Sequence, residues 1–247
     1  MNYLTYPCKV MNITQHHFEG NHLSHSMGKP WDYPIDDGCS DSGRDWFYCP
    51  CDEMKVVRIY GVGASGTNTV WLQSTDKVDM PIGRAIVTIM VEHAEDEDLK
   101  GIKVGRSFKR GQKMFREGKD GGASGNHFHI AVATGKIVGN GWRNNGNAWV
   151  LSTDGEQLKA DKAFYLDNVR VRNAAGYNFK NLPKEEEKVA SVTEKLDNSA
   201  DNYAAEAVKK AINKGVLKGT TTGDYKLHSS VTRQDLFVFL DRLGLLD

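Results

Sequence analysis

Two histidines stand one residue apart in a run of alternating apolar residues, Gly125-Asn126-His127-Phe128-His129-Ile130-Ala131-Val132. Residues i and i+2 of a β-strand share a face, so His127 and His129 would point together into one pocket. The intervening apolar side chains would fill the opposite side of the strand. Neutral imidazole is the commonest metal ligand, and two on one strand face suit Zn²⁺. The pattern predicts a metal site, with a solvated polar strand face as the alternative.

The elements that must position these histidines are mostly strands. From Trp46 to about Ile137, β-branched or aromatic runs are bounded by Gly and Asp clusters; they include residues 54–60, 69–73 and 85–91. Helical periodicity is weak throughout this part, and a hairpin with a closing strand is expected within residues 138–182. The sequence therefore predicts a mainly β chain, with an antiparallel β-sheet domain over residues 1–182.

The character of the sequence changes after residue 182. Residues 183–198 form a charged stretch that begins with a proline, which is typical of a linker. Residues 203–212 have helical periodicity, and a capping-box pattern from Thr232 to Asp235 precedes a second apolar run. Residues 199–247 are therefore expected to form a small α-helical hairpin module, with only a marginal core of its own.

Composition excludes several classes of partner. Among the 247 residues, Lys+Arg and Asp+Glu balance at 32 each, so neither a nucleic-acid partner nor an acidic membrane surface is indicated. No apolar stretch approaches the length of a membrane span, so no membrane insertion is expected. The N-terminus lacks a basic region followed by an apolar run. We therefore expect cytoplasmic synthesis without a signal peptide.

Two other patterns are not expected to carry the chemistry. The cysteines form no Cys-x-x-Cys pair, and no disulfide framework is expected among them: Cys8, Cys39, Cys49 and Cys51. Cys49 and Cys51 share one face of a predicted strand and are expected to be small core residues, with metal ligands as the alternative. Residues 61–66 match the Gly-x-Gly-x-x-Gly string of dinucleotide-binding proteins. That motif requires a helix immediately after it, whereas a strand-like run follows here, so a hairpin loop is predicted.

Three features, in the correct order, resemble the lysostaphin-type zinc metallopeptidases, which cut peptide bonds in bacterial peptidoglycan. They are the His127-Phe128-His129 strand, a strand over residues 87–93 that ends in a lone histidine, and the intervening stretch 104–114, which is similar to the family's hairpin there. The resemblance covers about residues 20–135. It implies one Zn²⁺ per chain and hydrolysis of a peptide bond by zinc-activated water.

In that family a histidine, an aspartate and the second histidine of His-x-His hold the metal. The last of these matches His129. The aspartate usually lies four residues after the first histidine, and this chain departs from that spacing. We prefer His25 and Asp36 as the remaining ligands, with an enlarged loop between them. His22 is the alternative to His25.

A second alternative takes the first two ligands from residues 41–45. This segment has the spacing usual in the family, but Asp41 stands where the histidine should be. Asp45 would then supply the carboxylate, although it lies too close to the strand that follows. The resemblance also implies roles for His93 and His127 beside the water and the developing oxyanion. One would assist deprotonation, and both would stabilise the tetrahedral intermediate. For His93 the alternative is a hydrogen-bonded histidine at a strand end.

The C-terminal segment resembles one S-layer-homology repeat. The matching positions lie within residues 204–219 and 231–236. Such repeats attach proteins to cell-wall polymers, usually as a set of three. The resemblance implies binding of a wall polymer or self-association through residues 199–247, and an isolated packing hairpin is the alternative.

The layout as a whole resembles that of phage endolysins. It implies an enzyme that is made in the host cytoplasm and acts on cell-wall peptidoglycan after release. The alternative from another class is a non-catalytic relative with a degenerate metal site, which would bind the wall or activate another hydrolase.

Overall fold

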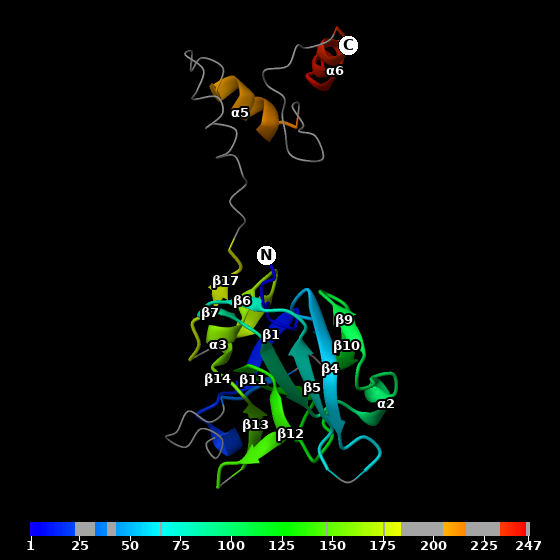
Figure 1. Ribbon diagram of the computed structural model, residues 1–247, viewed down its shortest axis with the longest axis vertical. Helices are drawn as coiled ribbons and strands as arrows, with labels where there is room; N and C mark the ends of the chain where they lie inside the picture. The colour runs from blue at the N-terminus through cyan, green and yellow to red at the C-terminus, as the bar shows by residue number, and fades with distance from the viewer. Residues whose placement is uncertain are drawn as a thin grey trace. The chain divides into compact units, whose positions relative to one another are not determined.

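The computed structural model describes residues 1–22, 33–38, 43–64, 66–146, 148–174, 176–183, 205–215 and 233–245. The chain divides into two compact units, Met1–Leu182 and Pro183–Asp247. The described helices of the second unit are α5 (Ala205–Asn213) and α6 (Arg233–Arg242), shown in Figure 1. Strands dominate the first unit, so the prediction of a mainly β chain is confirmed.

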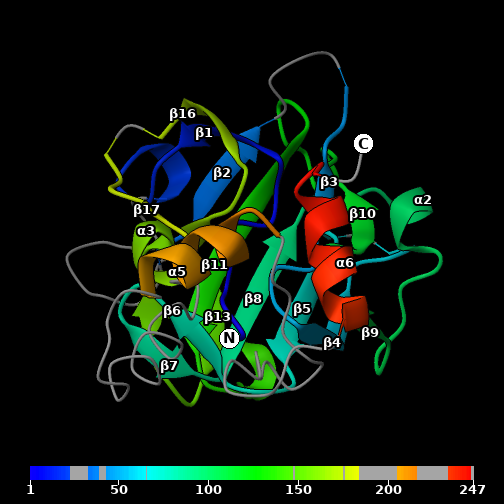
Figure 2. The same ribbon diagram turned by 90° about the horizontal axis from the view of Figure 1, so that it is seen from above.

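A nine-stranded sheet forms the centre of the first unit. Its order is β16 (Arg170–Asn173), β1 (Val10–Gln15), β2 (Ile35–Gly38), β11 (His127–Thr134), β8 (Val87–Glu92), β5 (Thr69–Ser74), β4 (Glu53–Tyr60) and β9 (Ser107–Lys109), with β14 (Gln157–Leu158) also paired to β11. Figure 2 shows the main strands in this order across the unit. Neighbouring strands are antiparallel except β1 and β16. The predicted strands over 54–60, 69–73 and 85–91 correspond to β4, β5 and β8.

Smaller pairs of strands and short helices surround this sheet. The pairs are β3 (Trp46–Tyr48) with β10 (Lys113–Arg116), β6 (Val78–Met80) with β7 (Gly83–Ala85), β12 (Ile137–Asn144) with β13 (Trp149–Thr153), and β15 (Tyr165–Leu166) with β17 (Lys180–Asn181). The short helices η1 (Gly20–His22), α2 (Asp96–Leu99) and α3 (Ala160–Ala163) were not expected. Residues 61–66 join two paired antiparallel strands, β4 and β5, so the hairpin prediction is confirmed.

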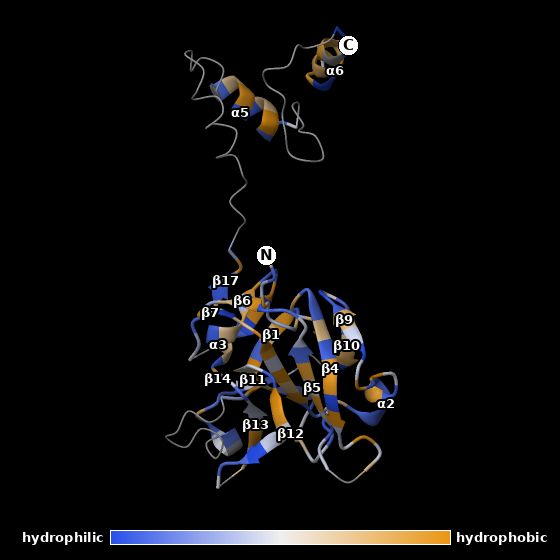
Figure 3. Cartoon of the chain, in the orientation of Figure 1, coloured by the Kyte–Doolittle hydropathy of each residue, from blue (hydrophilic) through white to orange (hydrophobic). Residues whose placement is uncertain are grey.

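The two faces of the central sheet carry different side chains because residues alternate along each strand. The even-numbered apolar residues of β11 lie in the main core, as predicted: Phe128, Ile130 and Val132. The odd-numbered positions of β11 face the other side, where a smaller apolar cluster includes the fully buried Trp71. His127 and His129 therefore share the sheet face of Trp71. Figure 3 shows hydrophobic residues on the central strands and hydrophilic residues in many surrounding loops.

Several further expectations concern the rest of the chain. Cys8, Cys49 and Cys51 are buried in the main core with free thiols. Cys39, Thr232 and most of the predicted linker lie outside the described residues. Within the described ranges, no helix combines the length and apolar character needed to cross a membrane.

Candidate metal centre

Strands β2 and β11 bring a carboxylate against an imidazole. The strands are antiparallel, with Asp36 directly opposite His129. Side chains of directly opposite residues share a face and have Cβ atoms within about 5.5 Å of each other. Asp36 Oδ1 accordingly lies 3.1 Å from His129 Nδ1. The structure therefore brings these two predicted ligands together. Asp36 does not end its strand, because β2 continues for two residues beyond it.

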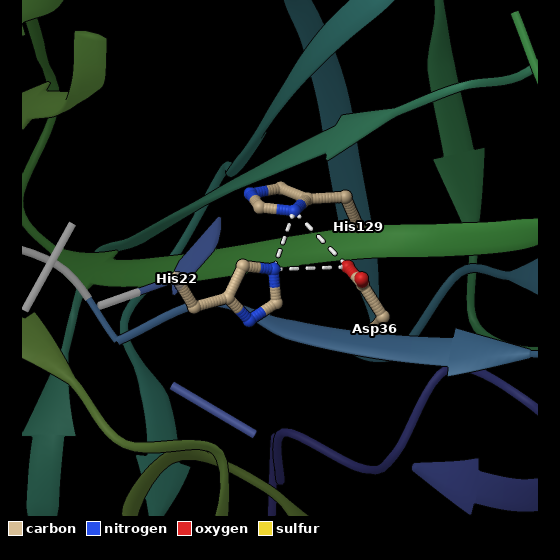
Figure 4. Close-up of side chains that lie close together, drawn as sticks. All are labelled: His22, Asp36 and His129. Atoms are coloured by element: carbon tan, nitrogen blue, oxygen red, sulfur yellow. Dashed lines mark hydrogen bonds and ion pairs between the residues drawn. The ribbon is translucent and has the colours of Figure 1, made fainter. Parts of the chain in front are cut away.

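His22, at the end of η1, completes a triangle of donor atoms with Asp36 and His129 (Figure 4). Its Nε2 lies 3.1 Å from His129 Nδ1 and 3.2 Å from Asp36 Oδ1. Its Nδ1 lies 3.0 Å from the carbonyl oxygen of His16. Because a carbonyl only accepts, this nitrogen carries the proton, and the Nε2 lone pair faces the triangle. His22 was the alternative to His25, which lies outside the described residues.

Protons alone do not satisfy all three sides of this triangle. The carboxylate of Asp36 only accepts hydrogen bonds, so each facing nitrogen would need a proton to bond with it. Two such N–H groups would then oppose each other across the 3.1 Å between His22 and His129. If either nitrogen lacks its proton, its lone pair faces the carboxylate oxygen instead. A divalent cation is the species that all three lone pairs attract.

The distances fit zinc. Bonds of about 2.0–2.1 Å in tetrahedral geometry separate ligand atoms by about 3.3–3.4 Å. The three sides measured here are 3.1, 3.1 and 3.2 Å. His22 and His129 are 2% and 5% exposed, so their nitrogens are largely shielded from competing water. Two imidazoles and one carboxylate, with a fourth position left to water or substrate, form the donor set of a catalytic zinc site.

The carboxylate of Asp36 is held in the ionised form that a metal ligand requires. Burial by itself would raise its pKa, but the facing imidazoles of His129 and His22, when they carry protons toward the carboxylate, outweigh burial and hold the pKa well below the usual value. The adjacent Asp37 has the opposite behaviour, since burial raises its pKa to about 6. The Tyr6 hydroxyl donates to Asp37 Oδ2 at 2.9 Å, which ties β2 to the N-terminal arm. This bond helps to hold the strand that presents Asp36.

The two histidines predicted to assist catalysis lie together beside the triangle. The ring centres of His93 and His127 are 4.4 Å apart, and that of His93 is 6.0 Å from His129. His127 Nε2 lies 3.6 Å from Asp36 Oδ1. All five side chains therefore belong to one site, assembled from η1, β2, β11 and the end of β8.

Backbone carbonyl groups determine the tautomers of these two rings. His127 Nδ1 donates to the carbonyl of Gly125 at 2.9 Å, and His93 Nδ1 donates to that of Asp120 at 2.7 Å. In each neutral ring the proton is therefore on Nδ1, and Nε2 is the nitrogen that accepts another. Burial lowers the pKa of His93, although the hydrogen bond to Asp120 opposes this effect. His93 is thus neutral at neutral pH and suited to act as a base.

His93 also has an unusual backbone conformation. Its φ of +76° lies in the left-handed region, which non-glycine residues seldom adopt and which is often found at functional sites. Two backbone bonds maintain it: His93 N donates to Asn68 O, and Asp120 N donates to His93 O. A Cβ on Gly118 would lie 2.4 Å from the His93 carbonyl oxygen, so only glycine fits there. The segments that contain Asn68 and residues 118–120 therefore hold His93 in this conformation.

The structure also places the remaining candidates. Asp45 immediately precedes β3, where its carbonyl accepts from Glu117 N, and it belongs to neither potential metal-binding group of the described residues. Asp41 lies outside the described residues. Glu92 was missed: it offers a carboxylate oxygen within 4.8 Å of a ring nitrogen of His93 and of His129. In the sequence, only its position next to His93 could have indicated that it lies near the site.

No protein-family model matches the chain. The chain is 28% identical to "Morphogenesis protein 1" of Bacillus phage B103 over an alignment of 186 residues, which covers 71% of this chain and 43% of that protein. It thus spans less than half the length of this curated relative.

Similar solved structures include a zinc-containing peptidase from Vibrio cholerae, with 20% identity, a TM-score of 0.35, and coverage of 53% of this chain and 36% of that one. Csd3 of Helicobacter pylori has 20% identity and a TM-score of 0.35, covering 65% of this chain and 38% of that one. CbpA of L. salivarius REN has 15% identity and a TM-score of 0.33, covering 58% and 80%. These similarities are too low to support a functional argument, so the function is inferred from the geometry of the site.

Proposed function

We propose that this chain is a zinc metallopeptidase that hydrolyses a peptide bond in bacterial peptidoglycan. The observation that carries the proposal is the triangle of donor atoms from His22, Asp36 and His129, with two more imidazoles beside it. This arrangement supplies the ligand and catalytic sets that the resemblance to lysostaphin-type peptidases implies. His22 takes the place of the first histidine of that family.

The chemistry follows from the positions of the side chains. When bound, zinc lowers the pKa of water and polarises the scissile carbonyl. His93 Nε2 takes the proton of the attacking water, because burial keeps this ring neutral, and returns it to the leaving amine nitrogen as the peptide C–N bond breaks. His127 Nε2, which lies 3.6 Å from Asp36 Oδ1, stabilises the developing oxyanion when its ring carries a second proton. The carbonyl groups of Gly125 and Asp120 keep both rings oriented throughout.

The test is zinc-dependent cleavage of purified cell walls. We expect one zinc per chain, and new amino termini in peptidoglycan from susceptible bacteria by mass spectrometry of the released fragments. A chelator should abolish the cleavage, and added zinc should restore it. Intact stem and cross-bridge peptides after digestion with the zinc-loaded protein would refute the proposal. Wall binding without zinc or cleavage would instead support the non-catalytic alternative.

The biological setting proposed is that of a phage endolysin acting on the host wall. The similarity to a phage morphogenesis protein favours a second setting, a peptidase carried by the phage particle. Mass spectrometry of purified particles distinguishes the two. An endolysin would be absent from particles and needed for host lysis, whereas a particle-borne peptidase would be a constituent of every preparation.

For the second unit we propose attachment to a wall polymer or self-association through residues 199–247. Helix α5 carries the described part of the S-layer-homology pattern: Ala207, Val208 and Ala211. The other matching positions, apart from Gly215 and the helix that follows residue 232, lie outside the described residues. Removal of this unit is the corresponding test, and its expected result is given below.

A further inference from the structure

A cavity of about 580 Å³ opens on the same sheet face as the two catalytic histidines. Side chains from β4, β5, β8 and the β12–β13 hairpin line it, including Arg58, Tyr60, Thr69, Glu92, Trp142 and Trp149. Glu92 belongs both to this lining and to the group within 4.8 Å of nitrogens of His93 and His129. The cavity therefore begins beside the metal centre.

A row of paired residues runs from the metal centre into the cavity. Directly opposite one another on five adjacent strands are Asp36, His129, Glu92, Thr69 and Tyr60. Neighbouring strands lie about 4.8 Å apart, so Tyr60 is about 14 Å from His129 along this row. An extended peptide rises about 3.3 Å per residue, so the row spans about four residues of a bound peptide.

A β-bulge turns Arg58 toward this cavity. The pairing of β4 with β5 shifts between Val56 and Arg58, after which Arg58 stands opposite Trp71. Val57 also packs against the cluster of Trp71, so two consecutive residues face the same side, as a bulge allows. The guanidinium carbon of Arg58 lies 5.5 Å from the centre of the Trp71 ring.

The guanidinium of Arg58 has no anionic partner within the part of the chain that the structure describes. The side chain is partly buried, and its Nε is buried without a hydrogen-bond acceptor. Leaving a partly desolvated charge unpaired is unfavourable. A planar guanidinium matches a carboxylate through two parallel hydrogen bonds. Arg58 is therefore suited to an anionic group that a ligand brings.

The aromatic wall of the cavity is fixed at its base and exposed at its rim. Trp142 stands edge-on to Tyr60 and to Trp71, with ring centres 4.8 and 4.7 Å apart. Trp71 Nε1 donates to the Gly141 carbonyl, and a Cβ on Gly141 would lie 2.8 Å from that nitrogen. Tyr60 and Trp149 are 42% and 59% exposed. They leave apolar surface for the carbon chain next to a bound carboxylate.

We propose that this cavity binds a free carboxylate of the peptide substrate about four residues from the scissile bond. Arg58 pairs with the carboxylate, and the aromatic wall covers the adjoining carbon chain. The identity of the ligand as a peptide rests on the proposed function. The preferred substrates are therefore wall peptides that retain a free carboxylate at this position, rather than their amidated forms.

Binding tests this inference separately from catalysis. The probes are peptides released from peptidoglycan by an amidase, before and after carbodiimide-mediated amidation of their carboxylates. Tryptophan fluorescence of the His93→Ala protein would report their binding without cleavage. We expect the free acids to bind about tenfold or more tightly than the amides, the scale of a charge-assisted pair. Arg58→Met should bind both alike, Arg58→Lys should keep part of the preference, and Arg84→Met on the exposed β7 should keep all of it.

Kinetics on wall digests supply the second readout. Arg58→Met should raise KM with little change in kcat or zinc content, because it removes binding alone. Equal binding of acids and amides by the unsubstituted protein would overturn the inference, as would an undiminished preference in Arg58→Met. Tighter binding of wall disaccharides that lack peptide would also overturn it. A preference for free acids without any cleavage would keep the binding site and reject the catalytic proposal.

Discussion

Replacing Asp36 by Asn should weaken zinc binding by about a thousandfold while the first unit stays folded. The amide preserves side-chain size but has no charge and a poorer ligand oxygen. Asp36 Oδ1 is also the corner of the triangle that meets both imidazoles, at 3.1 and 3.2 Å. Zinc contributes roughly 10–16 kcal/mol in small structural sites, so one of three protein ligands accounts for about 4 kcal/mol. That is about 10³ in Kd.

The loss should be visible as a loss of zinc-dependent stability. At a zinc concentration of about 1,000 times the original Kd, binding stabilises the fold by about 4 kcal/mol. At the same concentration the variant would be near its own Kd and gain only about 0.4 kcal/mol. For a unit of this size, 1 kcal/mol shifts Tm by about 2–4 °C. The zinc-induced rise in Tm should therefore fall from about 8–16 °C to about 1 °C.

Scanning calorimetry with and without zinc, together with chelator competition for the Kd, measures both quantities. Asp45→Asn is the matched control, because it makes the same chemical change at the other candidate carboxylate. It should keep normal zinc affinity and wall-clearing activity. If Asp36→Asn binds zinc within about tenfold of the unsubstituted protein while Asp45→Asn does not, the ligand assignment is wrong. If both retain zinc, the reasoning from the donor triangle is wrong.

His93→Ala or His127→Ala should keep zinc but lose about a hundredfold or more in turnover; loss of zinc from either variant would make that residue a ligand. Deleting residues 184–247 should preserve zinc and cleavage of soluble muropeptides but weaken lysis of intact walls, because tethering raises the local substrate concentration. Equal loss on both substrates would contradict this. Burial lowers the pKa of His17 to about 4, so the unfolded chain binds a proton that the folded chain does not between there and about pH 6.5. The free energy of unfolding should therefore fall as pH drops through this range. Urea unfolding of His17→Gln should show a smaller fall, and an unchanged pH dependence would contradict a lowered pKa for His17.

Local periodicity is the part of the fold that the sequence reveals. Alternation places His127 and His129 on one face of a strand because successive residues point to opposite sides. Their apolar neighbours then lie in the main core, as the structure shows. The runs that became β4, β5 and β8 are recognisable for the same reason, since β-branched and aromatic residues favour extended backbone. Each of these inferences needs only residues within a few positions of one another.

The partners of His129 depend on contacts between distant parts of the chain. His22 and Asp36 lie 107 and 93 positions before it. They meet it because β2 pairs with β11 in one register and a short helix follows β1. Arg58 shows the same limit: simple alternation would place it with the buried Val56, and the bulge against β5 turns it to the other face. The sequence by itself determined which residue types could bind zinc and which strand presents His129. Strand order, register and bulges decided which residues meet, because they depend on packing of the whole sheet rather than on neighbouring residues.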